Sequence, residues 1–245
     1  MERILDSWHS PNLDKQMEIA IYGNHGLAML MFPSAGADYL EYERFYLIDS
    51  IKPFIEQGKV RVFSINSINN ESWLNSQLSG EQKAARHQQY NRYVTDEVVP
   101  YIRGAMGGDA RPITCGVSLG AFHAANSLFR RPDLFDGTIG MSGIYDLKSY
   151  SKGYYDEDVY YNSPVDYLPN LHDESLLAQL RSKNQINFLS GEGSYEAPAA
   201  SWAIADILGM KNIPNNVEIW GNEWGHDWPT WRAMLPSYLE RNVLR

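Results

Sequence analysis

The 245-residue sequence contains a single cysteine, Cys115, which excludes an internal disulfide and a cysteine-based zinc cluster. Long apolar runs are also missing, because no stretch approaches the roughly 18 uninterrupted apolar residues that a membrane helix needs. The first residues, MERILDSWHSPN, mix charged with apolar side chains and contain no small-residue cleavage site, unlike a signal peptide. We therefore expect a cytoplasmic protein with no membrane partner.

Positive charge is the scarcer sign. The chain has 21 Lys and Arg against 30 Asp and Glu, a formal net charge of -9 and a pI near 5.1. Nucleic-acid binding normally needs a clustered basic face, and no run of Lys and Arg occurs, so we expect no nucleic-acid partner. The hydrophobic share of 44% and the charged share of 21% are typical of a globular protein. The length fits one domain spanning residues 1–245.

The order of the apolar segments predicts alternating strands and helices. Two N-terminal strands, QMEIAIYG and GLAMLMF, are separated by the turn-forming residues 23–26, which predict a tight antiparallel hairpin. A helical pattern over residues 39–56 then leads into the short apolar run VRVFSI, a βαβ crossover. The alternation continues through PITCGV, SLGAFHAANSLFRR, DGTIGMS, INFLSG, PAASWAIADILGMKN and NVEIWG. This order predicts a mostly parallel sheet with helices on both faces.

Two stretches interrupt the alternation, SINSINNESWLNSQLSGE and residues 146–173. Long irregular segments in a compact domain are typical of lids and binding loops, so both are predicted to be rim insertions. Aromatic side chains in such loops line pockets or stabilise the loops themselves. The candidate substrate-binding residues there are Trp73, Tyr154, Tyr155 and Tyr160.

The sharpest local motif is GVSLG at residues 116–120. It fits the G-x-S-x-G nucleophile elbow and falls where a predicted strand ends and a helix begins, which is the context of an α/β-hydrolase fold. Flanking glycines let the chain turn sharply and project the Ser118 hydroxyl above the sheet. Cys115 is a rival nucleophile, but a cysteine inside an apolar strand is more often a buried, inert thiol.

A serine nucleophile needs a histidine base, which a carboxylate orients. In this fold the three residues follow the order serine, acid, histidine, and the histidine lies in the loop after the last strand. The run GNEWGHDW places His226 there. Structural roles suit the remaining histidines, which are His9, His25, His87, His123 and His172.

The acid should follow the strand INFLS, where the loop GEGSYE offers Glu192 and Glu196. We prefer Glu196, which lies farther out toward the next helix, because Glu192 also fits a solvated loop charge. Asp146 is a third option after the preceding strand. Asp227 follows the base directly and is predicted to cap the final helix.

An oxyanion hole needs two backbone donors. One is the amide of the residue after the nucleophile, Leu119. The other is expected in the segment PSAG after the strand GLAMLMF, at Ala35. Small residues at 34–36 allow a close approach of the backbone to a substrate, although they also fit a tight turn.

The chain resembles the Putative esterase family of α/β-hydrolases, which includes esterase D (S-formylglutathione hydrolase), feruloyl esterases and the mycolyltransferase antigens. The resemblance rests on YVTDEVVPYI at 93–102, on the elbow with its sequel GVSLGAFHAANSLFRRPDLFDGTIGMSG, and on the ending GHDWPTWRAMLP. It implies a triad of Ser118, Glu196 and His226, with neither a metal nor an organic cofactor. Pro33-Ser34 replaces the commoner His-Gly pair of the oxyanion loop, and the secretion signal expected of feruloyl esterases and mycolyltransferases is missing.

These observations predict a serine esterase that hydrolyses a small-molecule carboxylic ester or thioester through an acyl-enzyme on Ser118. An acyltransferase that uses the same triad is an alternative, as is a non-catalytic binding protein on the same fold. Self-association into a homo-oligomer is left open by the sequence.

Overall fold

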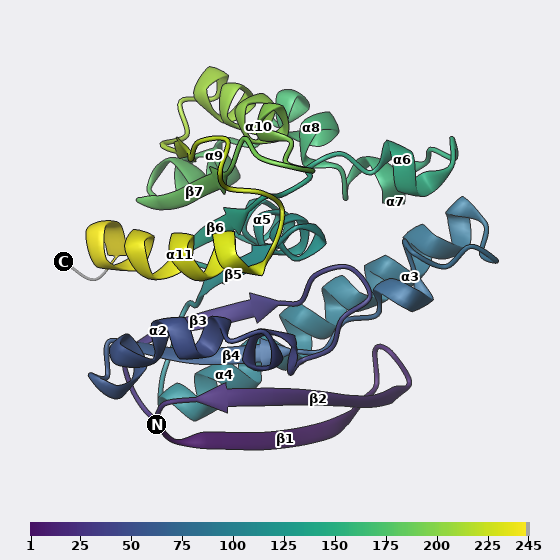
Figure 1. Ribbon diagram of the computed structural model, residues 1–245. Helices are drawn as coiled ribbons and strands as arrows, with labels where there is room; N and C mark the ends of the chain where they lie inside the picture. Colours follow the sequence, from purple (N-terminus) through teal and green to yellow (C-terminus); the bar gives the residue numbers. More distant parts are fainter. Residues whose placement is uncertain (244–245) are drawn as a thin grey trace.

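A computed structural model describes residues 1–243 of the chain. Within that range eight strands form one sheet in the order β1-β2-β4-β3-β5-β6-β7-β8 (Figure 1). The strands are β1 (Arg3–Ser10), β2 (Lys15–Tyr22), β3 (Leu27–Phe32), β4 (Val60–Ile65), β5 (Ile113–Val117), β6 (Gly137–Met141), β7 (Gln185–Ser190) and β8 (Asn216–Ile219). Strand β2 runs antiparallel to β1 and β4, and the five pairings from β4 through β3 to β8 are parallel. The predicted mostly parallel sheet is confirmed.

The predicted hairpin between β2 and β3 is wrong. Both strands form, but β4 lies between them, and the antiparallel hairpin partner of β2 is β1. Strand β3 is buried along nearly its whole length, so it takes parallel partners on both edges. The connecting turn packs instead on the start of β4: a Cβ at Gly26 would lie 2.5 Å from the carbonyl carbon of Lys59.

The helices cover both faces of the sheet (Figure 1). Alternate side chains of β3 supply the two cores, with Leu30 and Phe32 facing one side and Met29 and Met31 the other. The second side is covered by α1 (Glu41–Arg44), α2 (Leu47–Glu56) and α11 (Trp228–Tyr238). The first is covered by α3 (Gly80–Tyr93), η2 (Val94–Val98), α4 (Val99–Met106), α5 (Leu119–Arg130), α9 (Glu174–Arg181) and α10 (Pro198–Met210).

The helix expected over residues 39–56 is divided in two, because Tyr46 adopts a left-handed φ of 62° between α1 and α2. The predicted rim insertions also contain short helices. These are η1 (Asn69–Glu71), α6 (Lys148–Ser151), α7 (Glu157–Tyr160), α8 (Pro164–Tyr167) and η3 (Leu168–Asn170). The last described element is η4 (Leu239–Val243).

The parallel strands β3, β5, β6, β7 and β8 end at the same edge of the sheet, and each is the neighbour of the next. In parallel α/β sheets this carboxyl edge is where ligands bind. The segments that leave it carry the candidate oxyanion loop, nucleophile, acid and base. Along this edge the candidate oxyanion loop follows β3, the nucleophile follows β5, the acid follows β7 and the base follows β8.

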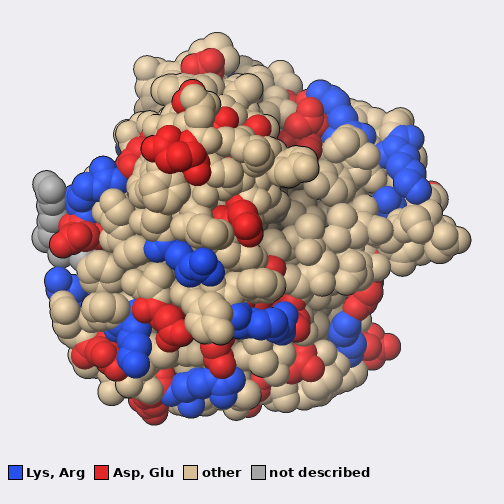
Figure 2. Space-filling view, in the orientation of Figure 1, with Lys and Arg blue, Asp and Glu red and all other residues tan. Residues whose placement is uncertain are grey.

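Basic and acidic side chains are interspersed on the face of the molecule drawn in Figure 2. Among residues 1–243, no helix is both long and apolar enough to cross a membrane.

Candidate active site

Ser118 occupies a strained turn between β5 and α5. Its φ of 54° and ψ of -122° lie outside the regions that non-glycine residues ordinarily adopt. The turn is compressed: a Cβ at Gly116 would lie 2.2 Å from the backbone of Gly120, and one at Gly120 would lie 2.2 Å from the Phe32 carbonyl oxygen. Only glycine fits at either position. The predicted elbow geometry is therefore present, with Ser118 at the N-terminus of a helix.

The buried tyrosine Tyr42 joins the elbow to the neighbouring strand. Its hydroxyl donates a hydrogen bond to the carbonyl oxygen of Phe32, at the end of β3, and accepts one of 3.2 Å from the amide of Val117. The ends of β3 and β5 are thereby fixed relative to each other. Burial raises the pKa of Tyr42 well above its ordinary value, so the phenol keeps its proton and can act as donor and acceptor at once.

The loop after β3 is held by a buried carboxylate, Glu41. It accepts one hydrogen bond from the Ser34 amide, at 2.7 Å, and another from the Ser34 hydroxyl. Burial raises the pKa of Glu41, and the two bonds from Ser34 oppose that rise. Because the Ser34 amide is already engaged, it is not free for a substrate. The Ala35 amide donates to no other group within residues 1–243, and the Leu119 amide begins α5, where no intrahelical acceptor is available.

A second tether reaches the same loop from α5. The ring nitrogen Nε2 of His123 lies 2.8 Å from Asn69 Oδ1, and Asn69 Nδ2 lies 3.5 Å from the Ser34 carbonyl oxygen. Burial lowers the pKa of His123 to about 3, so its imidazole stays neutral. As predicted, His123 has a structural place, packed within the helix layer.

Glu196 and His226 lie on two loops that the backbone joins together. Three hydrogen bonds link the β7–α10 loop to the β8–α11 loop: Gly193 amide to Trp224 carbonyl at 2.9 Å, His226 amide to Ser194 carbonyl at 2.9 Å, and Glu192 amide to Gly221 carbonyl at 3.3 Å. A side chain at Gly191 would collide with the Trp224 carbonyl oxygen, 1.9 Å away. The two loops are therefore one packed unit.

In that unit the Glu196 carboxylate faces the imidazole, with Oε2 3.7 Å from His226 Nδ1. The side chain of Glu196 is 0% exposed and that of His226 is 26% exposed. Burial acts to raise the pKa of Glu196, but His226 and the hydroxyls of Ser142 and Ser190 outweigh it, and the pKa is lowered overall. The carboxylate is thus ionised beside the imidazole at neutral pH.

Three residues that the sequence analysis did not identify hold this carboxylate in place. Ser142 Oγ donates to Glu196 Oε1 at 2.6 Å, and Ser190 Oγ donates to Oε2 at 3.0 Å. The indole nitrogen of Trp231 donates to Ser142 Oγ at 2.9 Å, and its ring packs edge-on against the His226 imidazole. Their sequence signal is positional: Ser142 directly follows β6, Ser190 ends β7, and Trp231 lies five residues after the base.

The other candidates for acid and nucleophile lie elsewhere. Glu192 is exposed, and Asp146 Oδ1 accepts from the Lys148 amide at 2.8 Å. Asp227 caps α11 by accepting from the Trp228 amide, as predicted. Cys115 is fully buried, which raises the pKa of its thiol to about 12.

The four candidate substrate-binding aromatic residues do not form one group. Trp73 is 1% exposed and packs with Leu119 beneath the elbow. Tyr154 packs on the same cluster, while Tyr155 is 51% exposed. Tyr160 lines a cavity of about 300 Å³ beside the C-terminal half of α5, together with Phe129, Arg130, Tyr161 and Tyr167 among others. Within residues 1–243 no group of three or more His, Cys, Asp or Glu is placed to hold a metal ion.

The family model described as Putative esterase matches residues 47–241, most of the chain and all of the elements that carry Ser118, Glu196 and His226. The chain belongs to the Putative esterase family. It is accordingly an α/β-fold serine hydrolase that acts on carboxylic esters. No curated protein sequence matches this esterase significantly.

Solved structures share its fold over nearly the whole length. A ferulic acid esterase matches with a TM-score of 0.76 and 18% identity, covering 97% of this chain and 95% of that one. An S-formylglutathione hydrolase from Staphylococcus aureus matches with a TM-score of 0.72 and 14% identity, covering 98% and 97%. MPT51 of Mycobacterium tuberculosis matches with a TM-score of 0.59 and 15% identity, covering 98% and 99%.

Proposed function

We propose that the protein hydrolyses a small-molecule carboxylic ester or thioester with Ser118 as nucleophile, His226 as general base and Glu196 as the acid that orients the base. His226 takes the proton from Ser118 Oγ as that oxygen attacks the carbonyl carbon. His226 then protonates the leaving alcohol or thiol, which leaves an acyl-enzyme. Water, deprotonated by the same imidazole, hydrolyses the acyl-enzyme and regenerates Ser118.

The amides of Ala35 and Leu119 are the proposed donors to the oxyanion that forms at the carbonyl oxygen. Leu119 follows Ser118 at the first position of α5, and Ala35 follows Ser34 on the loop that Glu41 holds. Fixed donors stabilise developing charge without reorganising, and each well-placed donor contributes about 2.7 to 4 kcal/mol to the transition state. The partial positive charge at the helix N-terminus acts in the same direction.

The observation that carries the proposal is the pairing of Glu196 with His226. A buried, ionised carboxylate 3.7 Å from Nδ1 favours the proton on that nitrogen, and this leaves Nε2 unprotonated, as a general base must be. If Glu192 were the acid instead, its side chain, which is exposed to solvent, would have to move to reach the His226 imidazole.

The decisive experiment measures hydrolysis of p-nitrophenyl esters of graded acyl length by the wild type and by Ser118→Ala, His226→Ala, Glu196→Gln and Glu192→Gln. We expect turnover by the wild type, a loss of at least about 1,000-fold in kcat for Ser118→Ala, and a deep loss for His226→Ala. Glu196→Gln should be strongly impaired, whereas Glu192→Gln, its matched control on the same loop, should retain the wild-type rate.

Full activity of Ser118→Ala would exclude the proposed nucleophile. A deeper loss of activity for Glu192→Gln than for Glu196→Gln would identify Glu192, and not Glu196, as the acid of the triad. A parallel assay with a thioester substrate separates the two leaving groups. Adding a short alcohol and measuring the ester product separates hydrolysis from acyl transfer.

A further inference from the structure

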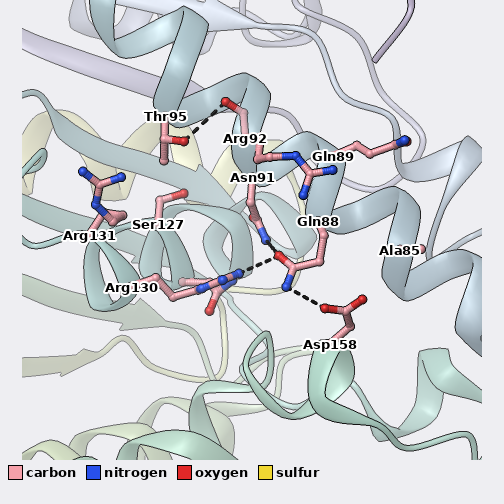
Figure 3. Close-up of a pocket in the computed structure, with 11 residues that line it drawn as sticks. Ala85, Gln88, Gln89, Asn91, Arg92, Thr95, Ser127, Arg130, Arg131 and Asp158 are labelled. Atoms are coloured by element: carbon pink, nitrogen blue, oxygen red, sulfur yellow. Dashed lines mark hydrogen bonds between the residues drawn. The ribbon is translucent and has the colours of Figure 1, made fainter. Parts of the chain in front are cut away.

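A cavity of about 460 Å³ lies between α3, η2, α5 and α7, apart from the proposed active site (Figure 3). Its α5 wall is formed by the C-terminal half of that helix, from Asn126 onward. Ser118 caps the other end of the same helix, and the nine residues from Ser118 to Ser127 correspond to roughly 13 Å of helical rise. A ligand in this cavity would therefore occupy a site separate from the one where an ester reacts.

Hydrogen-bond donors crowd one side of this cavity. Asn162 Oδ1 accepts from three side chains, Asn91 at 2.7 Å, Arg130 at 2.9 Å and Asn126 at 3.0 Å. Gln88 Oε1 accepts from Asn91 and Arg130, both at 2.9 Å (Figure 3). Two neutral amide oxygens thus accept five hydrogen bonds, so this wall of the cavity has more hydrogen-bond donors than acceptors.

Arg130 is a largely buried cation whose protein partners are all neutral. Both of its hydrogen bonds leave from Nη1, and within residues 1–243 it forms no ion pair with a carboxylate. Its Nε and Nη2 groups carry three further N–H donors, which have no acceptor in the same range. Burial lowers the pKa of Arg130, as expected for a charge taken out of water, and the nearby Asp158 carboxylate only partly opposes that shift.

The remaining charges of the lining leave a positive balance. Arg131 is neutralised by a two-point contact with Asp133, at 2.8 and 2.6 Å. Arg92 is exposed at the cavity, and its guanidinium has no hydrogen bond or ion pair within residues 1–243. The acid in the lining is Asp158, which accepts from Gln88 Nε2 at 2.9 Å. The lining thus holds two guanidinium groups that form no ion pair within residues 1–243, against one carboxylate, in a chain whose net charge is -9.

We propose that this cavity binds a small organic oxyanion, a carboxylate or a phosphate, with its charged group between Arg130 and Arg92. The planar guanidinium of Arg130 presents paired donors that match the oxygens of either group. The cavity volume lies within the 300–1,000 Å³ typical of small-molecule sites, so it accommodates an organic body beyond the anionic group. The site is independent of the proposed esterase chemistry.

The test is a calorimetric titration at constant ionic strength with two probes in separate runs, inorganic phosphate and succinate. We expect saturable binding of at least one probe by the wild type, and the preferred probe identifies the anionic group. Arg130→Gln and Arg92→Gln should each weaken that binding by about tenfold, the effect of losing a charge-assisted hydrogen bond. If Arg130→Gln fails to fold, as judged by circular dichroism, Arg92→Gln decides, because Arg92 is exposed.

Two controls locate the binding. Lys59→Gln removes the same charge from an exposed position on the α2–β4 connection and should leave the affinity unchanged. Ser118→Ala should also leave it unchanged, because the probe does not use the proposed oxyanion hole. The proposal is overturned if neither probe saturates the wild type, if Lys59→Gln weakens binding as much as Arg92→Gln does, or if Ser118→Ala abolishes it.

Discussion

Ser142 and Glu196 are separated by 54 residues in the chain, yet Ser142 Oγ donates a hydrogen bond of 2.6 Å to the Glu196 carboxylate. Ser142 adopts a left-handed φ of 50° at the end of β6, and its amide bonds to the Leu189 carbonyl at 2.7 Å. The same Ser142 hydroxyl accepts a hydrogen bond of 2.9 Å from the indole nitrogen of Trp231. A residue outside the proposed triad is thus held, under backbone strain, where it fixes the orientation of the acid.

Ser142→Gly should lower kcat by about tenfold or more and leave KM nearly unchanged. Glycine adopts the φ of 50° without strain, so the variant isolates the lost hydroxyl, whose bond to a charged group is worth about 1.5–3 kcal/mol. Loss of this donor should also raise the pKa of Glu196, so that activity on the acid side of the pH profile fades at a higher pH. The control is Asn212→Gly, another left-handed position, with a φ of 56°, on the α10–β8 connection. Equal kcat values and pH profiles for the wild type and Ser142→Gly would contradict a positioning role.

Trp231→Phe should reduce kcat by a smaller factor, about threefold to tenfold. Phenylalanine retains an aromatic ring against the His226 imidazole but loses the N–H that bonds to Ser142, a neutral hydrogen bond worth about 1 kcal/mol. The double variant with Ser142→Gly tests whether the two act through one route. We expect it to be no slower than Ser142→Gly alone, and full multiplication of the two losses would refute the shared route.

Glu41→Ala should lower kcat by about tenfold or more, because the loop that carries Ala35 loses both hydrogen bonds from Ser34 and the oxyanion donor is no longer held in place. Glu41→Gln keeps an acceptor for the Ser34 amide and should retain most of the activity. Steady-state kinetics on a short p-nitrophenyl ester compares the two. Wild-type kcat in the alanine variant would show that the loop holds its shape without Glu41.

Stability toward acid should depend on Glu196. Because its pKa is lowered in the folded protein, ionised Glu196 contributes to the free energy of unfolding above its ordinary pKa, and the contribution is lost as the pH falls through the lowered value. Urea unfolding of the wild type and Glu196→Gln should therefore differ most near neutrality, with the gap closing in acid. A gap that stays constant with pH would indicate that the carboxylate's charge plays no part.

Gly120→Ala should fail to give a stable fold, because the added methyl group would lie 2.2 Å from the Phe32 carbonyl oxygen and 2.7 Å from that of Pro33. We expect a destabilisation above about 3 kcal/mol, measured by chemical unfolding or as loss of soluble protein. Gly209→Ala is the matched control in α10, because a Cβ there meets nothing within 4 Å. This variant should raise the free energy of unfolding by up to about 1 kcal/mol. A stable, active Gly120→Ala variant would mean that the elbow can open.

The sequence identified the parts whose signals are local. Apolar runs located β2 to β8, and the motif around Ser118 predicted the elbow that its backbone angles bear out. Strand β1 was not predicted because its side chains are largely exposed, as suits the edge of a sheet. The order of β2, β4 and β3 was also beyond reach, since a turn signature is local while strand pairing joins distant segments.

The surroundings of the proposed acid had no comparable motif. Glu192 and Glu196 share one short loop. They differ in how the β7–α10 loop packs against the β8–α11 loop, and this packing requires glycines where the chain faces the Trp224 backbone. Ser142 contacts Trp231 across 89 residues, and single serines and tryptophans occur for many reasons. Such contacts follow only once the strands have been placed side by side.

The union of the β7–α10 and β8–α11 loops suggests how this scaffold can be re-engineered. Main-chain groups supply the links between them, so the outward side chains of Ser194 and Tyr195 can be exchanged without moving His226. Glycines 191 and 193 cannot, because the opposing backbone leaves no room for a Cβ. A mutational library aimed at new substrates should therefore keep these two glycines and randomise the outward positions around them.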